Sequence, residues 1–255
     1  MKNDNSEKSG FISHLVELRQ RLINSFIFLF SFFVVCYFFS EEIYSFLVQP
    51  YADAVKDDNV NRRLIFTALQ ETFLTYLRVS FFAALFVSSP IILIQIWKFI
   101  APGLYKNEKE AILPYLIATP ILFLFGGMLV YYLIMPLAIK FFLSFEASSI
   151  NSALPIQLEA KVNEYLSLVM KLIFAFGLSF QLPVILSLLA RVGFVDSVFL
   201  KERRKYVVVI IFVAAAILTP PDPITQIGLA IPLLILYELS IFSVKIIEKR
   251  KNKNA

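Results

Sequence analysis

The chain has 255 residues, of which 58% are hydrophobic and 17% are charged, and its mean hydropathy is +0.74. This composition excludes an ordinary water-soluble domain and indicates that lipid is the main solvent. The net charge of +5 does not indicate a nucleic-acid partner, because the basic residues flank the apolar runs and form no soluble basic face.

The apolar runs have the lengths of membrane-spanning helices, which need about 20 residues to cross the hydrocarbon core. The 27 Phe and only seven Gly favour long helices over a turn-rich sheet, and no barrel-type alternation of polar and apolar residues is present. We therefore predict an all-α membrane protein with a single domain over residues 1–255. The six predicted spans are 22–39, 76–96, 111–137, 165–190, 206–218 and 224–244.

The last two predicted spans are short and are joined by the sequence TPPDP, whose prolines cannot continue a helix. The fifth run, 206–218, would reach only about 20 Å at 1.5 Å per residue, against a hydrocarbon core about 30 Å thick. Two interpretations stay open. Either the bilayer is thin at this position, or the flanking residues complete a normal span.

Lys and Arg are distributed unequally between the two sides of the predicted bundle. Seventeen of the 24 lie before the first span, in the connections 98–109 and 191–205, and in the tail from residue 245. Only five lie in the alternate connections. Because positive charge is retained on the cytoplasmic side, we expect both termini in the cytoplasm.

No motif for catalysis or metal binding is present in the sequence. A glycine-rich phosphate loop, HExxH and GxSxG are all absent. His14 is the only histidine and Cys36 the only cysteine, so neither has companions at metal-ligand spacing and no intramolecular disulfide can form. We therefore expect no enzyme activity, no cofactor and no metal site.

Six short motifs follow one another along the chain. They are SHLVELRQRL (13–22), LRVSF (77–81), QIWKFIAPGLYKNEK (95–109), MPLA (135–138), FGLSFQLPV (176–184) and LTPPDPITQ (218–226). In this order and with the predicted topology, the chain resembles the TatC family, the multispanning subunit of the twin-arginine protein translocase. The resemblance covers essentially the whole chain.

This resemblance implies a receptor subunit in the cytoplasmic (inner) membrane of a bacterium. It would bind the twin-arginine signal peptides of folded cargo proteins and assemble with the single-span proteins TatA and TatB and with other TatC copies. Export would be driven by the protonmotive force. The alternative is a secondary transporter or channel for a small solute or ion, for which Gln181 at membrane depth is the only support.

Glu17 and Glu108 are the candidate residues for binding the arginine pair of a signal peptide. A guanidinium presents a planar fork that carboxylates bind through two charge-assisted hydrogen bonds. The resemblance places Arg19 in the same site, and Phe99 would form an aromatic wall for the apolar part of the peptide. The simpler alternatives are a local ion pair of Glu17 with Arg21 at i, i+4 and a solvated loop charge at Glu108.

Five further residues are candidates for partner contacts or transport. Gln181 lies inside the fourth span, where an unpaired amide costs several kcal/mol, so we expect it to pack within the bundle or to contact a partner's helix. Many TatC relatives carry Glu here, and Gln cannot titrate. Pro50 and Phe73 match the family's first periplasmic region and would shape a cap. Tyr131 would pack at the interface or act in transport, and Asp222 would cap the next helix or act in transport.

Overall fold

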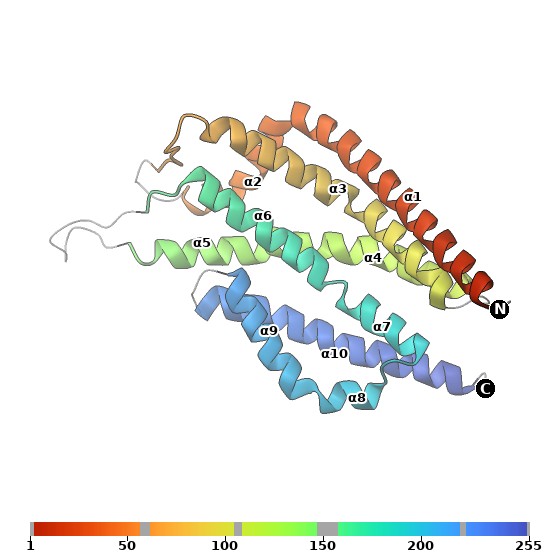
Figure 1. Ribbon diagram of the computed structural model, residues 1–255. Helices are drawn as coiled ribbons and strands as arrows, with labels where there is room; N and C mark the ends of the chain where they lie inside the picture. Colours follow the sequence, from red (N-terminus) through yellow and green to blue (C-terminus); the bar gives the residue numbers. More distant parts are fainter. Residues whose placement is uncertain (1–2, 57–61, 105–108, 147–157, 220–222, 254–255) are drawn as a thin grey trace.

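The computed structural model describes residues 3–56, 62–104, 109–146, 158–219 and 223–253. Within these ranges the chain is helical, apart from short connections and one isolated β-bridge. Figure 1 shows the long helices side by side in one bundle, with both chain termini at the same end. We call this the terminal end, and the opposite end, with the residues 62–70, 144–146 and 158–161, the distal end.

The amino-terminal part of the bundle consists of three helices. Helix α1 (Asn3–Phe38) runs from the terminal end to the distal end and packs along α3 (Glu71–Leu104), which returns in the opposite direction (Figure 1). The shorter α2 (Ser40–Ala54) packs against α3 and against the later helix α5 (Met135–Leu143). Of the candidate span in α1, only 6% is buried inside the chain. Most of that helix is therefore available to lipid or to another protein.

The remaining helices complete the bundle. In chain order they are α4 (Lys109–Leu129), the π-helix η1 (Val130–Ile134), α5 (Met135–Leu143), α6 (Val162–Ser179), α7 (Leu182–Val192), α8 (Ser197–Glu202), α9 (Arg204–Leu218) and α10 (Pro223–Lys253). Helix α10 packs against both α7 and α9, and α4 packs against α6. The main core lies between α2, α3, η1, α5, α6, α9 and α10.

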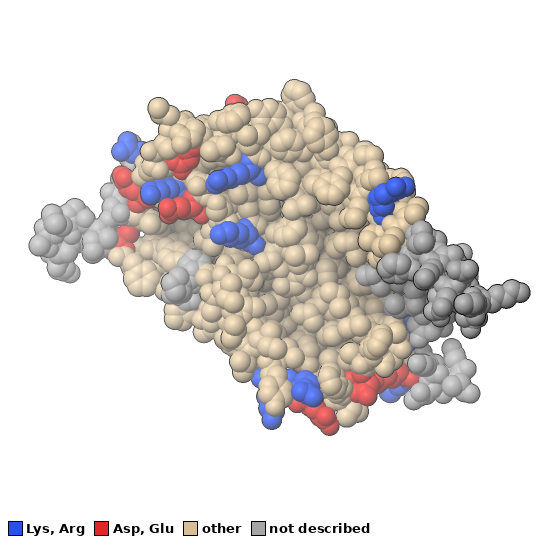
Figure 2. Space-filling model, in the orientation of Figure 1, with Lys and Arg blue, Asp and Glu red and all other residues tan. Residues whose placement is uncertain are grey.

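Within the described residues, five helical segments are long and apolar enough to cross a membrane: His14–Phe38, Glu71–Phe99, Pro114–Leu143, Val162–Val192 and Thr225–Lys249. The predicted span 206–218 corresponds to α9, whose 15 residues are too few to qualify by length, so the structure supports five of the six predicted spans. Phe26, Phe30 and Phe38 are each about two-thirds exposed or more, as expected for surfaces that face lipid. Figure 2 shows the charged residues mostly toward the ends, with a broad uncharged surface between them.

The fourth predicted span, 165–190, is two helices and not one. Helix α6 ends at Ser179, and α7 begins at Leu182 after a turn at Phe180 and Gln181. Pro183 stands in the first turn of α7, where its missing N–H leaves no hydrogen bond unmade. The motif FGLSFQLPV (176–184) contains this proline, but the continuous hydrophobicity of residues 165–190 led to the prediction of one unbroken helix.

The distal end is held together by an ion pair between segments far apart in the sequence. Arg62 Nη1 and Nη2 donate to the two carboxylate oxygens of Glu146 at 2.6 and 2.5 Å, and the side chains are only 6% and 18% exposed. The backbone N–H of Leu158 also donates to Glu146. Near this pair in the sequence, Ile65 and Lys161 form an isolated parallel β-bridge. The arginine holds the pKa of Glu146 below its usual value.

Two glycines allow α4 and α6 to approach closely. A Cβ atom added at Gly126 would lie 2.7 Å from the carbonyl oxygen of Phe176, and one at Gly177 would lie 2.7 Å from the ring of Phe123. In contrast, nothing lies within 4 Å of a Cβ added at Gly228 in α10. The contact between α4 and α6 therefore depends on the missing side chains.

We expect Gly126→Ala to destabilise the folded protein by about 1–3 kcal/mol, because the methyl group would have to displace the backbone of α6. Gly228→Ala is the matched control. It adds the same methyl group inside a helix with open space and should be neutral or stabilising by up to about 1 kcal/mol. Thermal unfolding of both purified variants in detergent measures the difference, and equal effects of the two changes would contradict the close packing of α4 on α6.

We expect Arg62→Met to cost about 3–5 kcal/mol, because it leaves Glu146 partly buried without its counter-charge. The double variant Arg62→Met with Glu146→Leu should recover much of this loss. Arg204→Met serves as the control, since the Arg204–Glu238 pair is about half exposed and should contribute less than about 1 kcal/mol. Denaturation of the three variants in the same detergent compares them.

Acid should weaken the distal end. Because the folded-state pKa of Glu146 is lowered, its contribution to stability is fully present above the unfolded-state value of about 4.3 and is lost as the pH falls through the lower folded-state value. We expect the melting temperature of Glu146→Gln to depend less on pH below about 5 than that of the unchanged protein. Parallel pH dependences would show that this carboxylate does not contribute.

Candidate functional site

Five side chains of α1 and α3 meet on the face that the two helices share near the terminal end. His14, Glu17 and Arg21 stand at i, i+3 and i+7 on α1, and Gln95 and Phe99 stand at i and i+4 on α3. These spacings place each set on one side of its helix. The packing of α1 along α3 brings the two sets together, and we call the five residues the α1–α3 cluster.

Arg21 connects the two helices through its guanidinium group. Its Nη2 and Nε donate to the same carboxylate oxygen of Glu17, Oε1, at 2.5 and 3.0 Å. Its Nη1 donates to the amide oxygen of Gln95 at 3.1 Å. Three of its nitrogens are therefore engaged, two by its own helix and one by α3.

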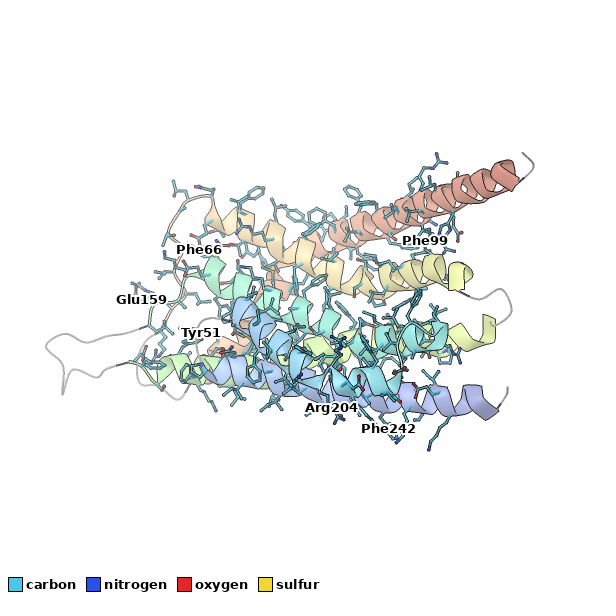
Figure 3. The ribbon with its side chains drawn as sticks, turned by 60° about the horizontal axis from the view of Figure 1, so that its bottom comes forward. Tyr51, Phe66, Phe99, Glu159, Arg204 and Phe242 are labelled. Atoms are coloured by element: carbon cyan, nitrogen blue, oxygen red, sulfur yellow. The ribbon has the colours of Figure 1, made fainter. Side chains whose placement is uncertain are left out.

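A second contact between the helices lies about two turns of α1 closer to the amino terminus. The ring of His14 stacks on the ring of Phe99, with centroids 4.2 Å apart and planes 10° from parallel. His14 Nδ1 lies 3.8 Å from Glu17 Oε2. Figure 3 places Phe99 toward the terminal end and Tyr51, Phe66 and Glu159 toward the distal end.

Glu17 thus stands between two interhelical contacts with its carboxylate still accessible. Its side chain is 35% exposed and that of Arg21 is 23% exposed. A carboxylate in this position can accept hydrogen bonds from a cationic group that approaches from outside, with less screening than in bulk water. The adjacent Phe99 offers apolar surface to the same ligand.

The structure describes one of the other two residues predicted for this site, Arg19, and it stands apart from the cluster. Arg19 is exposed on α1 and lies about 200° around the helix from Glu17. Glu108 lies outside the described residues, directly before Lys109, where α4 begins. The predicted grouping of Glu17 with Phe99 is consistent with the geometry, because one turn of helix separates Glu17 from the His14–Phe99 stack.

Gln181 finds its partner within the chain. It is 3% exposed, and its Nε2 donates to the backbone carbonyl of Thr119 on α4 at 2.9 Å. Its backbone N–H donates to the carbonyl of Leu178 across the break between α6 and α7. Its Oε1 and the hydroxyl of Thr119 are buried and have no hydrogen-bond partner in the described part of the chain. This geometry favours the packing role over a partner contact.

Tyr131, predicted to pack at the interface or to act in transport, is buried inside the bundle. It lies in the π-helix η1, its hydroxyl donates to the carbonyl of Phe46 on α2 at 2.7 Å, and its ring stacks on Phe46 at 4.4 Å. Pro50, on the same helix α2, is buried, whereas Phe73 in the first turn of α3 is 58% exposed. Asp222 lies outside the described residues.

The sequence singled out Glu17 and Phe99 as candidates but did not indicate that Gln95 and His14 lie beside them. The helical spacings of the α1–α3 cluster can be read from the sequence within each helix. Only the packing of α1 along α3 shows that the α1 residues face the α3 residues. Among the described residues, no group of three or more His, Cys, Asp and Glu is arranged to hold a metal ion.

Comparisons with known proteins agree on one family. The family model described as Sec-independent protein translocase protein (TatC) matches residues 13–232. The chain is 49% identical over 251 residues to the Sec-independent protein translocase protein TatC of Magnetococcus marinus, covering 98% of this chain and 89% of the relative. It is 36% identical over 231 residues to the protein of the same name from Escherichia coli, covering 91% and 86%.

A solved structure is similar over nearly the same range. The crystal structure of a twin-arginine translocase receptor, TatC, superimposes with a TM-score of 0.78 at 36% sequence identity. The match covers 92% of this chain and 99% of that chain. The fold and the sequence therefore indicate the same relatives.

Proposed function

Because the chain belongs to the TatC family and is a receptor subunit of the Sec-independent, twin-arginine protein translocase, we propose that the α1–α3 cluster is where it binds twin-arginine signal peptides. Glu17 is the acceptor for a guanidinium group of the peptide. Phe99, beside it, contacts the apolar segment that follows the arginines. Because the chain belongs to this family, we do not retain the alternative function of a secondary transporter or channel for a small solute or ion.

The observation that carries this proposal is the guanidinium already bound to Glu17. Arg21 lies 2.5 Å from the carboxylate, so the site accepts this chemical group at charge-assisted hydrogen-bond distance. The carboxylate is also accessible from outside the bundle, unlike Glu146 at the distal end, whose arginine partner is almost fully buried. Glu108 supplies the second carboxylate, and Arg19 orients the peptide by contacts outside the cluster.

The terminal end is the cytoplasmic end in this proposal. The excess of Lys and Arg in the terminal segments supports it, because such charge remains in the cytoplasm. Figure 1 is consistent with it, because both termini lie at one end, as an even number of crossings requires. Helix α9 would then be the short fifth of six crossings, and the membrane would be the inner membrane of a bacterium. We place the distal end on the periplasmic side.

Partner recruitment belongs to the membrane-embedded and distal surfaces. TatA, TatB and further TatC copies would dock on the exposed apolar sides of the bundle, with the exposed Phe73 as one contact. Pro50 and Tyr131, both buried, would support this surface by holding α2 in place, and Gln181 would keep the break between α6 and α7 in its observed shape. Asp222 would cap α10.

We expect Glu17→Gln to weaken binding of a twin-arginine leader peptide at least about tenfold, because it removes the charge that strengthens the hydrogen bonds to the guanidinium. The measurement is peptide binding to the full chain in lipid nanodiscs, followed by fluorescence anisotropy. Glu41→Gln, an exposed carboxylate in the first turn of α2, is the matched control and should leave binding unchanged. Equal affinities of the Glu17 and Glu41 variants would refute the assignment.

A further inference from the structure

The carboxylate oxygen Oε1 of Glu17 is already occupied. Both Nη2 and Nε of Arg21 donate to Oε1, whereas Oε2 has only His14 Nδ1 near it, at 3.8 Å. A bidentate pair with an arriving arginine needs both carboxylate oxygens. The leader peptide can therefore form its strongest contact only after Arg21 has left Oε1.

Arg21 can leave Oε1 without being stranded. Its Nη1 donates to Gln95 on α3 at 3.1 Å, and its side chain is 23% exposed, so after displacement the guanidinium keeps one protein partner and reaches water. The ion pair at the distal end differs in this respect. Arg62 is only 6% exposed, and its release would leave a charge buried. Of these two arginines, only Arg21 is placed to exchange.

We propose that Arg21 is an internal occupant of the guanidinium site, which an arginine of the leader peptide displaces from Glu17 onto Gln95. The inference rests on the proposed function of Glu17. The resting receptor is therefore self-occupied, and its apparent affinity for any leader that needs both oxygens is reduced by the fraction of molecules in which Glu17 is free.

This contact sets a threshold for binding. A leader with arginine can match the two hydrogen bonds that it replaces, because its planar fork has the same geometry as Arg21. A leader with lysine offers a point charge without that fork and replaces them poorly. Ligands that bind Glu17 more weakly than Arg21 does therefore do not displace Arg21 and leave the receptor without bound peptide.

The test is binding of a fluorescent twin-arginine leader peptide to the full chain in nanodiscs, with Arg21→Gln as the central variant. Gln retains a polar amide at this position but has no charged fork with which to occupy Glu17. We expect about tenfold tighter binding of the leader, and an intermediate gain for Arg21→Lys. Thermal unfolding of each variant, measured in parallel, shows whether the fold is retained.

Two further variants separate displacement from simple charge repulsion. Lys98→Gln removes an exposed positive charge on α3 near the same site, and it should not tighten binding. In a Glu17→Gln background, Arg21→Gln should also bring no gain, because there is no carboxylate left to release. A gain of similar size in either case would overturn the inference in favour of repulsion.

The remaining outcomes are also decisive. If Arg21→Gln leaves binding unchanged or weakens it while the protein stays folded, Arg21 is not a competitor and the inference is wrong. If Glu17→Gln alone has no effect on binding, the proposed site itself is wrong. A weakened Glu17→Gln together with an unchanged Arg21→Gln would leave the proposed site standing and remove only the self-occupied state.

Discussion

Hydrocarbon offers no hydrogen bonds, so every polar group of the backbone inside the apolar bundle must be satisfied by the chain itself. Long helices do this for most residues. Polar side chains at the irregular positions also find partners inside the chain: the Gln181 amide, in the break between α6 and α7, donates to the carbonyl of Thr119 on α4, and the Tyr131 hydroxyl, in the π-helix, donates to the carbonyl of Phe46 on α2. These two hydrogen bonds connect each irregular position to a neighbouring helix.

Because hydrocarbon also solvates charge poorly, most charged side chains lie toward the two ends of the molecule, and the ion pairs at the two ends differ in their burial. At the distal end, the Arg62–Glu146 pair is enclosed and joins segments 84 residues apart, so it acts as a fixed structural connection. At the terminal end, Glu17 and Arg21 belong to one helix and remain partly open to solvent. An enclosed pair resists exchange, whereas an open pair with a second acceptor nearby permits it. Burial, more than residue type, distinguishes the structural Arg62–Glu146 pair from the Glu17–Arg21 pair, for which we propose a role in recognition.

The arginine of the proposed leader peptide has the same guanidinium group as Arg21, which already binds Glu17 in this structure. Arg21 orients the Glu17 carboxylate through two hydrogen bonds, and Gln95 binds the same guanidinium from α3. In the proposed exchange, peptide binding would break the Arg21–Glu17 contact within α1 and leave Arg21 bound to α3 through Gln95.

Hydropathy, charge counts and motifs are local properties of the chain, so the amino-acid sequence was sufficient to predict the class of protein, the approximate spans, the segregation of positive charge and the family. It also identified Glu17 and Phe99, each within a local motif. The tertiary structure alone decided that Gln95 and His14 join them, that Arg62 meets Glu146, and that the fourth run breaks at Gln181 with its amide on α4. These contacts depend on how helices cross, and a crossing is set by the packing of whole surfaces, such as the glycine contact between α4 and α6, that no single segment encodes.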